Sequence, residues 1–128
     1  MSQDALPERA LRFVAKFIVS VEQLEILLLL SDSPDKYWRV EEVFQRIQSS
    51  TASVTERLAL LLQQGFLETD SRDPKSFRYR PASPELADEV DALKPLYLER
   101  RVKVIEAIYA VPDQIRSFAA AFKFKNQK

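Results

Sequence analysis

Carboxylates are the side chains best suited to chemistry in this 128-residue sequence, which contains no histidine and no cysteine. The absence of these two residues excludes a Ser/His triad, a cysteine nucleophile and metal sites built on imidazole or thiolate ligands. Two adjacent acidic pairs remain, Glu41 with Glu42 and Asp88 with Glu89. Both pairs lie in segments that read as helix, where a solvated charged face is a better interpretation than a pair of catalytic carboxylates. We therefore predict a protein that is not an enzyme and has no metal or other cofactor.

The glycine content restricts the possible functions further, because Gly65 is the only glycine in the sequence. Loops that cradle phosphates need several glycines, so neither a Walker loop nor a dinucleotide-binding loop is present. The first nine residues lack the basic start and the apolar run of a signal peptide. The longest apolar run, residues 26–30, is far shorter than the roughly 20 residues that span a bilayer. We expect a cytoplasmic protein with no membrane partner.

Charge is unevenly distributed, although 19 basic and 19 acidic residues cancel over the whole chain. Lys and Arg number three against six Asp and Glu in residues 1–35, and eight against six in residues 36–80. They number none against four in residues 81–93, and eight against three in residues 94–128. The middle of the chain is therefore mildly basic and the C-terminal part clearly so, which matters for any nucleic-acid partner.

Two helices are predicted before residue 31, where a cluster of turn residues begins. The first follows Pro7 and carries apolar residues at helical spacing, with Phe13 and Phe17 alongside. Its predicted stripe is Leu11, Val14, Ala15 and Ile18. The second follows Ser20, which forms a capping-box pattern with Gln23 ahead of an apolar segment. This second helix is apolar all round at its end, so we expect that end at the centre of the core.

A pair of helices separated by a short polar turn comes next. Residues 37–39 favour a short strand, and the following apolar series has the i, i+3, i+4, i+7 spacing of a helix. Its members are Val40, Val43, Phe44 and Ile47. Residues 48–51 interrupt the pattern, and a second helical series then follows, with Val54, Leu58, Leu61 and Leu62. Ser50 is the predicted N-cap of this helix and Gly65 its C′ residue.

A β-hairpin is predicted after Gly65, from residues 66–69 and 77–79, both rich in strand formers. Its flexible tip is expected to contain Arg72, Asp73, Pro74 and Lys75. Ser83 and Pro84 then begin another helix, whose apolar face carries Leu86, Val90, Leu93 and Tyr97. Pro95 either kinks this helix or begins a new one that runs to about Tyr109.

The C-terminal part contains an apolar seam with the alternating spacing of a coiled coil. The seam residues, our candidates for dimerisation, are Leu98, Val102, Ile105 and Tyr109. The alternative is that this helix packs back on its own domain. A second strip formed by Val104, Ile108 and Val111 favours self-association, because one small domain can hardly bury both strips. A last helix is predicted around residues 115–122, followed by lysines that form either a solvated terminus or a nucleic-acid-binding arm.

The order helix, short strand, helix, turn, helix, hairpin is that of a winged helix-turn-helix domain. The segment 50–58, read with Leu61, Leu62, Gly65, Phe66 and Leu67, resembles the recognition helix and wing entry of MarR- and ArsR-type regulators. The resemblance covers about half of the chain. It implies a mainly α fold with a small β-hairpin, divided into an N-terminal helix (1–19), a winged-helix domain (20–82) and a C-terminal helical extension (83–128).

The resemblance also implies a function and a set of contacts. It predicts a DNA-binding transcriptional regulator that acts as a homodimer on double-stranded DNA, with its recognition helix in the major groove. The implied DNA-binding residues are Ser50, Thr51, Ala52, Ser53, Thr55 and Glu56 on the helix and Arg72, Lys75 and Arg78 on the wing. Many such helices carry Arg or Lys near Glu56, whereas this one has only Arg57. A winged-helix module that binds a protein partner, without specific DNA binding, therefore remains the alternative.

Overall fold

The computed structural model describes residues 5–110, which form helices and a small antiparallel sheet. The first helices are α1 (Glu8–Phe17) and α2 (Val21–Ser31), followed by the two-residue strand β1 (Trp38–Arg39). The helix-turn-helix pair is α3 (Val40–Arg46) and α4 (Thr51–Gln63), and the hairpin is β2 (Leu67–Asp70) and β3 (Asp73–Tyr79). The last described helices are α5 (Pro84–Glu99) and α6 (Arg101–Ala110).

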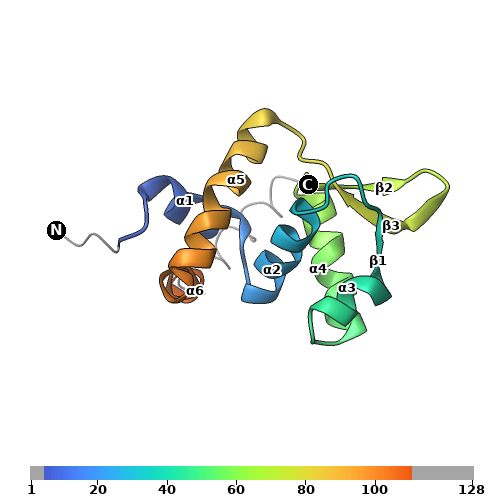
Figure 1. The fold of residues 1–128 in the computed structure, drawn as a ribbon, viewed down its shortest axis with the longest axis horizontal. Helices are drawn as coiled ribbons and strands as arrows, with labels where there is room; N and C mark the ends of the chain where they lie inside the picture. The colour runs from blue at the N-terminus through green and yellow to red at the C-terminus, as the bar shows by residue number, and fades with distance from the viewer. Residues whose placement is uncertain (1–4, 111–128) are drawn as a thin grey trace, which may run out of the picture.

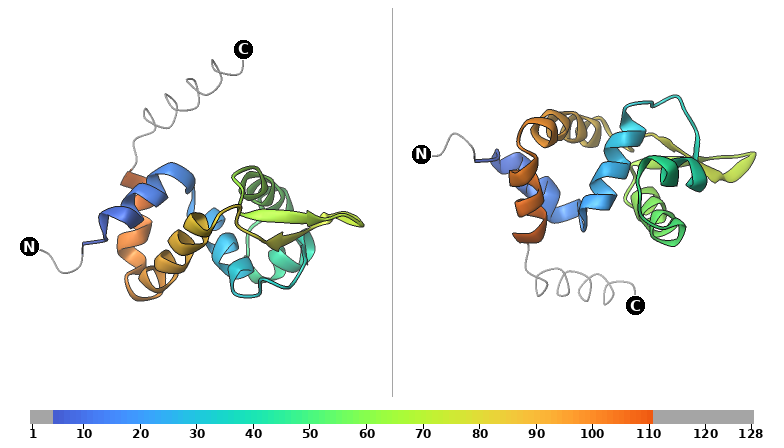
Figure 2. Two further views of the ribbon diagram at one scale, coloured as in Figure 1. Left: turned by 90° about the horizontal axis from the view of Figure 1, so that it is seen from above. Right: turned by 60° about the horizontal axis from the view of Figure 1, so that its bottom comes forward.

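The elements lie in two groups, with α2 between them (Figure 1). At one end α1, α5 and α6 pack together, and at the other end α3 and α4 lie beside the sheet. The tip of the β2–β3 hairpin extends beyond α3 and α4, away from the rest of the molecule, as Figure 2 shows from above. This arrangement leaves the hairpin and one side of α4 open to solvent at the same end of the molecule.

Serine side chains cap three helices, as the sequence predicts. Ser20, Ser50 and Ser83 each accept a hydrogen bond from the backbone N–H three residues later, at 3.1 to 3.2 Å. Such caps satisfy N–H groups that have no partner inside the helix. The predicted C′ glycine of α4 is also confirmed, since Gly65 follows the C-cap and has a φ of 92°.

Gln23 departs from the simple capping box. Its Oε1 accepts a hydrogen bond from the N–H of Val19 (2.7 Å) and not from that of Ser20. Its Nε2 donates to the carbonyl of Phe17 and to Oε1 of Gln64, both at 2.9 Å. Gln23 is completely buried, so this amide joins the turn between α1 and α2 to the end of α4 inside the core.

The apolar stripe predicted for α1 is wrong in part. Leu11 is 44% exposed and Ala15 is also exposed, whereas Phe13 is buried together with Val14. The reason is an aromatic cluster, in which the rings of Phe13, Phe17 and Phe66 lie 5.1 to 5.8 Å apart. These large rings bring their own face of the helix inward, because they bury more apolar area than Leu11 and Ala15.

The sheet has the order β1-β3-β2. Trp38 pairs with Phe77 in register, and the Trp38 side chain is buried in the core. The predicted hairpin is confirmed, but its tip is shorter than expected. Of the four predicted tip residues only Arg72 lies in the turn, because β3 already begins at Asp73, which is paired with Asp70.

Pro95 does not end α5, which continues through it to Glu99. The chain leaves the helical conformation at Arg100 (φ −131°, ψ 47°), and α6 begins at the next residue. Pro95 is exposed, so the carbonyl that loses its helical hydrogen bond there can bind water. Of the two alternatives predicted for Pro95, the start of a new helix is wrong, because α6 begins at Arg101.

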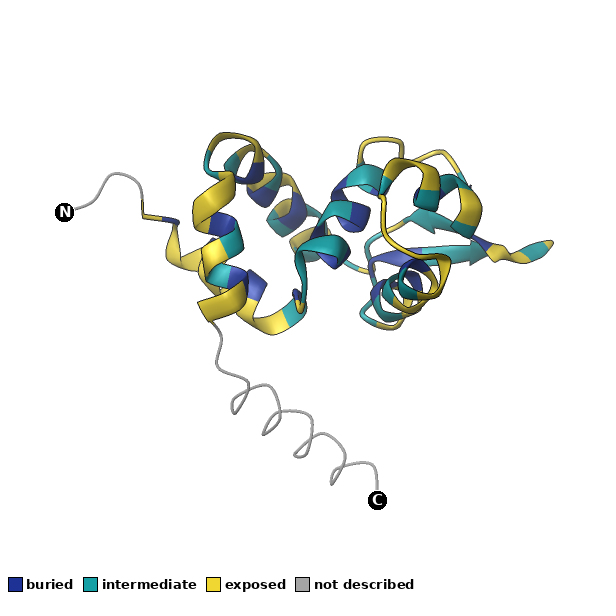
Figure 3. Cartoon of the chain, turned by 90° about the horizontal axis from the view of Figure 1, so that it is seen from below, coloured by how far each residue is buried: buried dark blue, intermediate teal, exposed yellow. Residues whose placement is uncertain are grey.

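The two apolar strips of α6 have different surroundings. Val104 and Ile108 are fully buried against the rest of the chain, whereas Leu98, Val102 and Tyr109 are 77%, 69% and 70% exposed. Figure 3 shows exposed positions along the outer side of α6. The helix thus packs back on its own domain through Val104 and Ile108 and leaves most of the predicted seam open, while the seam residue Ile105 is half-buried. Val111 of the second strip lies outside the described residues. The expected helix at residues 115–122 and the lysines after it lie outside the described residues.

Within residues 5–110, none of the helices combines the length and the apolar character needed to cross a membrane.

Candidate nucleic-acid interface

The outer face of α4 is positioned by a buried face on its opposite side. Val54, Leu58 and Leu61 are completely buried and pack α4 against α2 and α3. The side chains that the sequence assigns to DNA therefore lie on the far side of the helix. Exposed among them are Ser50, Thr51, Ala52, Thr55 and Glu56.

A groove of about 390 Å³ runs between the start of α4 and the hairpin. Thr51 and Thr55 line one wall, and Pro74, Lys75 and Phe77 of β3 line the other. Arg39, Val40 and Glu41 close the end of the groove. The structure thus brings together the recognition helix and the wing, which are separated by about 20 residues in the sequence. It also adds Arg39, which our sequence analysis did not select.

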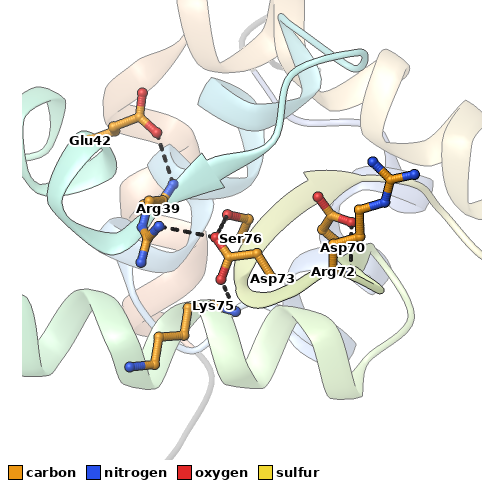
Figure 4. A network of polar contacts seen from close by, with 7 residues as sticks. All are labelled: Arg39, Glu42, Asp70, Arg72, Asp73, Lys75 and Ser76. Atoms are coloured by element: carbon orange, nitrogen blue, oxygen red, sulfur yellow. Dashed lines mark hydrogen bonds and ion pairs between the residues drawn. The ribbon is translucent and has the colours of Figure 1, made fainter.

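Asp73, the first residue of β3 after the turn, joins the tip end of the wing to β1 (Figure 4). Its Oδ2 accepts hydrogen bonds from Ser76 Oγ (2.8 Å) and Arg39 Nη1 (3.1 Å), and its Oδ1 accepts one from the N–H of Lys75 (3.3 Å). The hydrogen bond from Ser76 is the main cause that lowers the pKa of Asp73 below its ordinary value. The ionised carboxylate therefore orients the groove wall on which Lys75 lies.

Arg72 and Lys75 are the free cations of this region. Both side chains are exposed, and neither forms an ion pair with another residue of the described part. The Asp70 carboxylate accepts a hydrogen bond from the backbone N–H of Arg72 (3.0 Å) and so shapes the turn. Lys75 in the groove lining and Arg72 in the hairpin turn can each bind anionic groups such as phosphates.

Arg78 is placed differently from the other two predicted wing cations. Successive side chains of a strand alternate between its faces, and Lys75 and Phe77 line the groove. Arg78 faces the other way, where it forms an ion pair with Glu68 and lies over the ring of Tyr37, 4.7 Å from its centroid. The hydrogen bond to Glu68 raises the pKa of Arg78. The structure therefore does not bring Arg78 into the groove.

Ser53 also differs from its neighbours on α4. It is only half-exposed, and its hydroxyl donates a hydrogen bond to Glu22 of α2. Arg57 Nε lies 3.2 Å from the same oxygen of Glu22. Ser53 and Arg57 thus occupy the side of α4 that faces α2, away from the wing.

Thr55 keeps only part of its hydrogen-bonding capacity for a ligand. Its hydroxyl donates to the carbonyl of Thr51 (2.7 Å), so its oxygen can accept but its proton is already used. Glu56 is exposed and also accepts. The outer face of α4 therefore presents hydrogen-bond acceptors and the small side chain of Ala52.

Across residues 5–110, no three acidic side chains lie close enough together to hold a metal ion.

Comparison with known proteins gives one informative match. No family model matches the chain, and no curated protein matches it. Among solved structures, a mutant of MepR from S. aureus is similar, with a TM-score of 0.51 and 12% sequence identity. The match covers 94% of this chain and 89% of the MepR chain. The fold is therefore a winged helix, as the sequence predicts.

Proposed function

We propose that the protein is a DNA-binding transcriptional regulator that acts as a winged-helix dimer. The observation that carries this proposal is the groove between α4 and the wing, where Thr51 and Thr55 face Lys75. In DNA complexes of helix-turn-helix proteins, residues near the start of the recognition helix read base edges while nearby cations bind phosphates. The fold likeness to MepR and the sequence resemblance to MarR- and ArsR-type regulators support the same proposal.

The chemistry of the helix suggests which bases it would read. Glu56 can accept a hydrogen bond from the amino group of cytosine, and the oxygen of Thr55 can accept from either amino-bearing base in the major groove. Ala52 can contact a thymine methyl group. Arg72 and Lys75 would supply phosphate contacts that are independent of sequence.

A selection experiment tests the proposal. The protein is incubated with a pool of random duplexes, the bound duplexes are sequenced, and binding of the enriched sequence is measured by gel shift at low and physiological salt. We expect one enriched motif with two related half-sites about one helical turn apart. A protein that enriches no motif at either salt is not a sequence-specific regulator.

Substitutions on α4 separate base readout from general affinity. Thr55→Val and Glu56→Gln should change which base is preferred in the motif, by about 1 to 3 kcal/mol for each lost contact. The dependence of affinity on salt should stay almost unchanged, because neither residue is a cation. Ala59→Ser, an exposed position further along α4, serves as the control that should alter neither property.

A docking module for a protein partner is the second candidate. It is favoured by the ion pairs that neutralise Arg39, Arg57 and Arg78, since they reduce the positive charge available for DNA. In this case a pull-down would capture one stoichiometric protein partner, while DNA affinity would stay in the nonspecific range of about 10⁻⁴ to 10⁻⁶ M.

A further inference from the structure

The positive charge of α4 is paired with a carboxylate of the neighbouring helix α2. Arg57 is the only Lys or Arg in α4, and its Nε lies 3.2 Å from Oε1 of Glu22 on α2. The same oxygen accepts the hydrogen bond from Ser53. One carboxylate therefore restrains the two residues that lie four positions apart on this side of α4.

The restraint is partly shielded from water. The side chains of Glu22 and Arg57 are 16% and 29% exposed, so their attraction is screened less than that of a surface pair. Burial by itself raises the pKa of Glu22, but hydrogen bonds from Ser49, Ser53 and Arg57 outweigh it and lower the pKa below 4.5. Glu22 is therefore charged at neutral pH, and Arg57 stays paired with it.

The pairing divides the surface of α4 into two sides. On the wing side, Thr51 and Thr55 line the groove. On the α2 side, Ser53 and Arg57 are occupied by Glu22. Glu56, between them, is exposed and negative. The helix thus presents polar side chains on the wing side, and its one cation is paired with Glu22 on the α2 side.

We infer that Glu22 is a positioning residue that acts through Ser53 and Arg57 and limits the general affinity for DNA, by keeping Arg57 away from DNA phosphates. This inference rests on the proposed DNA-binding function. A phosphate contact strengthens binding to every sequence alike. By preventing one such contact, Glu22 lowers the affinity for every duplex by the same factor, and the base contacts of α4 still determine the preferred sequence.

The test compares Glu22→Gln with the unchanged protein on two probes, a random-sequence duplex and the duplex selected by the unchanged protein. We expect tighter binding of the random duplex by Glu22→Gln, with a plot of log affinity against log salt that is steeper by about 0.9, as for one added phosphate contact. The affinity for the selected duplex should rise by the same factor, so the ratio of the two affinities should stay the same. The double variant Glu22→Gln/Arg57→Gln should return the slope to its original value.

Glu25→Gln is the matched control, because Glu25 is also on α2 but pairs with Arg101, outside the winged part. It should change neither the slope nor the affinity for either duplex. Thermal melting of each variant checks that the fold is intact.

Arg57→Gln alone gives a second test that does not depend on the stability of Glu22→Gln. If Arg57 is kept away from DNA, removing its charge leaves the salt slope unchanged. A slope that becomes shallower by about 0.9 would show that Arg57 already binds a phosphate and would overturn the inference.

The remaining outcomes separate the inference from the proposed function. If the unchanged protein selects a motif while Glu22→Gln keeps the same salt slope, the inference is wrong and the function stands. If only Glu22→Gln binds DNA, the restraint is real and the proposed regulator function is wrong. If neither protein binds any duplex, both are wrong.

Discussion

A cation can bind a phosphate only at the expense of any carboxylate that already holds it. In the winged part, Arg39, Arg57 and Arg78 have carboxylate partners within the protein, whereas Arg72 and Lys75 do not. Composition alone gives all five the same weight. The structure separates the cations that have a carboxylate partner from those that do not, and each of these two classes leads to a prediction.

The unpaired cations should determine the salt dependence of DNA binding. We predict that Arg72→Gln and Lys75→Gln each make the plot of log affinity against log salt shallower by about 0.9, because each removes one phosphate contact. Base preference should not change. The matched control is Arg78→Gln, which removes a cation from the other face of β3 and should leave the slope as it is. Equal effects from all three substitutions would contradict this separation into two classes.

The Glu22 carboxylate should also make stability depend on pH. Its pKa in the folded protein is below the ordinary value of 4.5, so its ionised form stabilises the fold at higher pH. This contribution is complete above about pH 5 and is lost as the pH falls through the folded pKa. We predict that Glu22→Gln lowers the free energy of unfolding at pH 7 by about 1 to 2 kcal/mol, and that the loss shrinks towards pH 3.

Urea denaturation at pH 7, 5 and 3 measures this difference. Glu8→Gln is the control, because Glu8 is 81% exposed and pairs only with the exposed Arg12. Its effect should be small at every pH. A penalty for Glu22→Gln that stays constant from pH 7 to pH 3 would show that charge is not the cause.

At the scale of elements, the end of α4 depends on one backbone conformation. Gly65 has a φ of 92°, and a Cβ atom at this position would lie 3.3 Å from the Cβ of Ala82. We predict that Gly65→Ala lowers the free energy of unfolding by about 1 to 2 kcal/mol, because a residue with a Cβ is strained in the left-handed region. Chemical denaturation measures the loss.

The double variant Gly65→Ala/Ala82→Gly separates the two causes of this loss. It removes the close Cβ contact but leaves the left-handed conformation. Since the contact is only slightly tight, most of the penalty should remain beyond the cost of Ala82→Gly alone. Full recovery would assign the penalty to the contact instead of the backbone.

The elements that sequence analysis located well are those fixed by neighbours in the chain. The caps at Ser20, Ser50 and Ser83 and the glycine after α4 involve residues within four positions of each other. Their physical cause is local, so the pattern is sufficient to predict them.

The errors concern features that distant contacts decide. The buried face of α1 depends on Phe66, which lies about 50 positions away, and the length of the hairpin tip depends on strand pairing. Arg39 was missed as a groove residue because its place depends on pairing between β1 and β3. The break between α5 and α6 falls at Arg100, whose side chain donates to the carbonyl of Ala5. No periodicity in the sequence contains this information.

For the whole molecule, the exposed strip on α6 predicts association. Val102 and Tyr109 are each at least 69% exposed and lie on the side of α6 opposite the buried Val104, and Leu98 at the end of α5 is 77% exposed. We predict that Val102→Asp converts a dimer into a monomer in sedimentation equilibrium, because a buried charge without a partner is strongly unfavourable at an interface. The monomer should keep its fold, since Val102 makes little contact with its own chain.

Val104→Ala gives the opposite pattern and serves as the comparison. Truncating this buried side chain should lower the free energy of unfolding by about 2 kcal/mol without directly weakening association. If the unchanged protein is already a monomer at all concentrations, α6 is not a dimer interface. Binding of two DNA half-sites by a dimer would then require another contact surface between the two copies of the protein.

The amide pair inside the core has a consequence for related chains. Gln23 and Gln64 bond to each other, and each also donates to the carbonyl of Phe17. An apolar residue in place of Gln64 leaves the fully buried amide of Gln23 without its acceptor on Gln64, a change that costs more than replacing both. The two positions should therefore covary. Homologues that have this core should either keep both glutamines or replace both together.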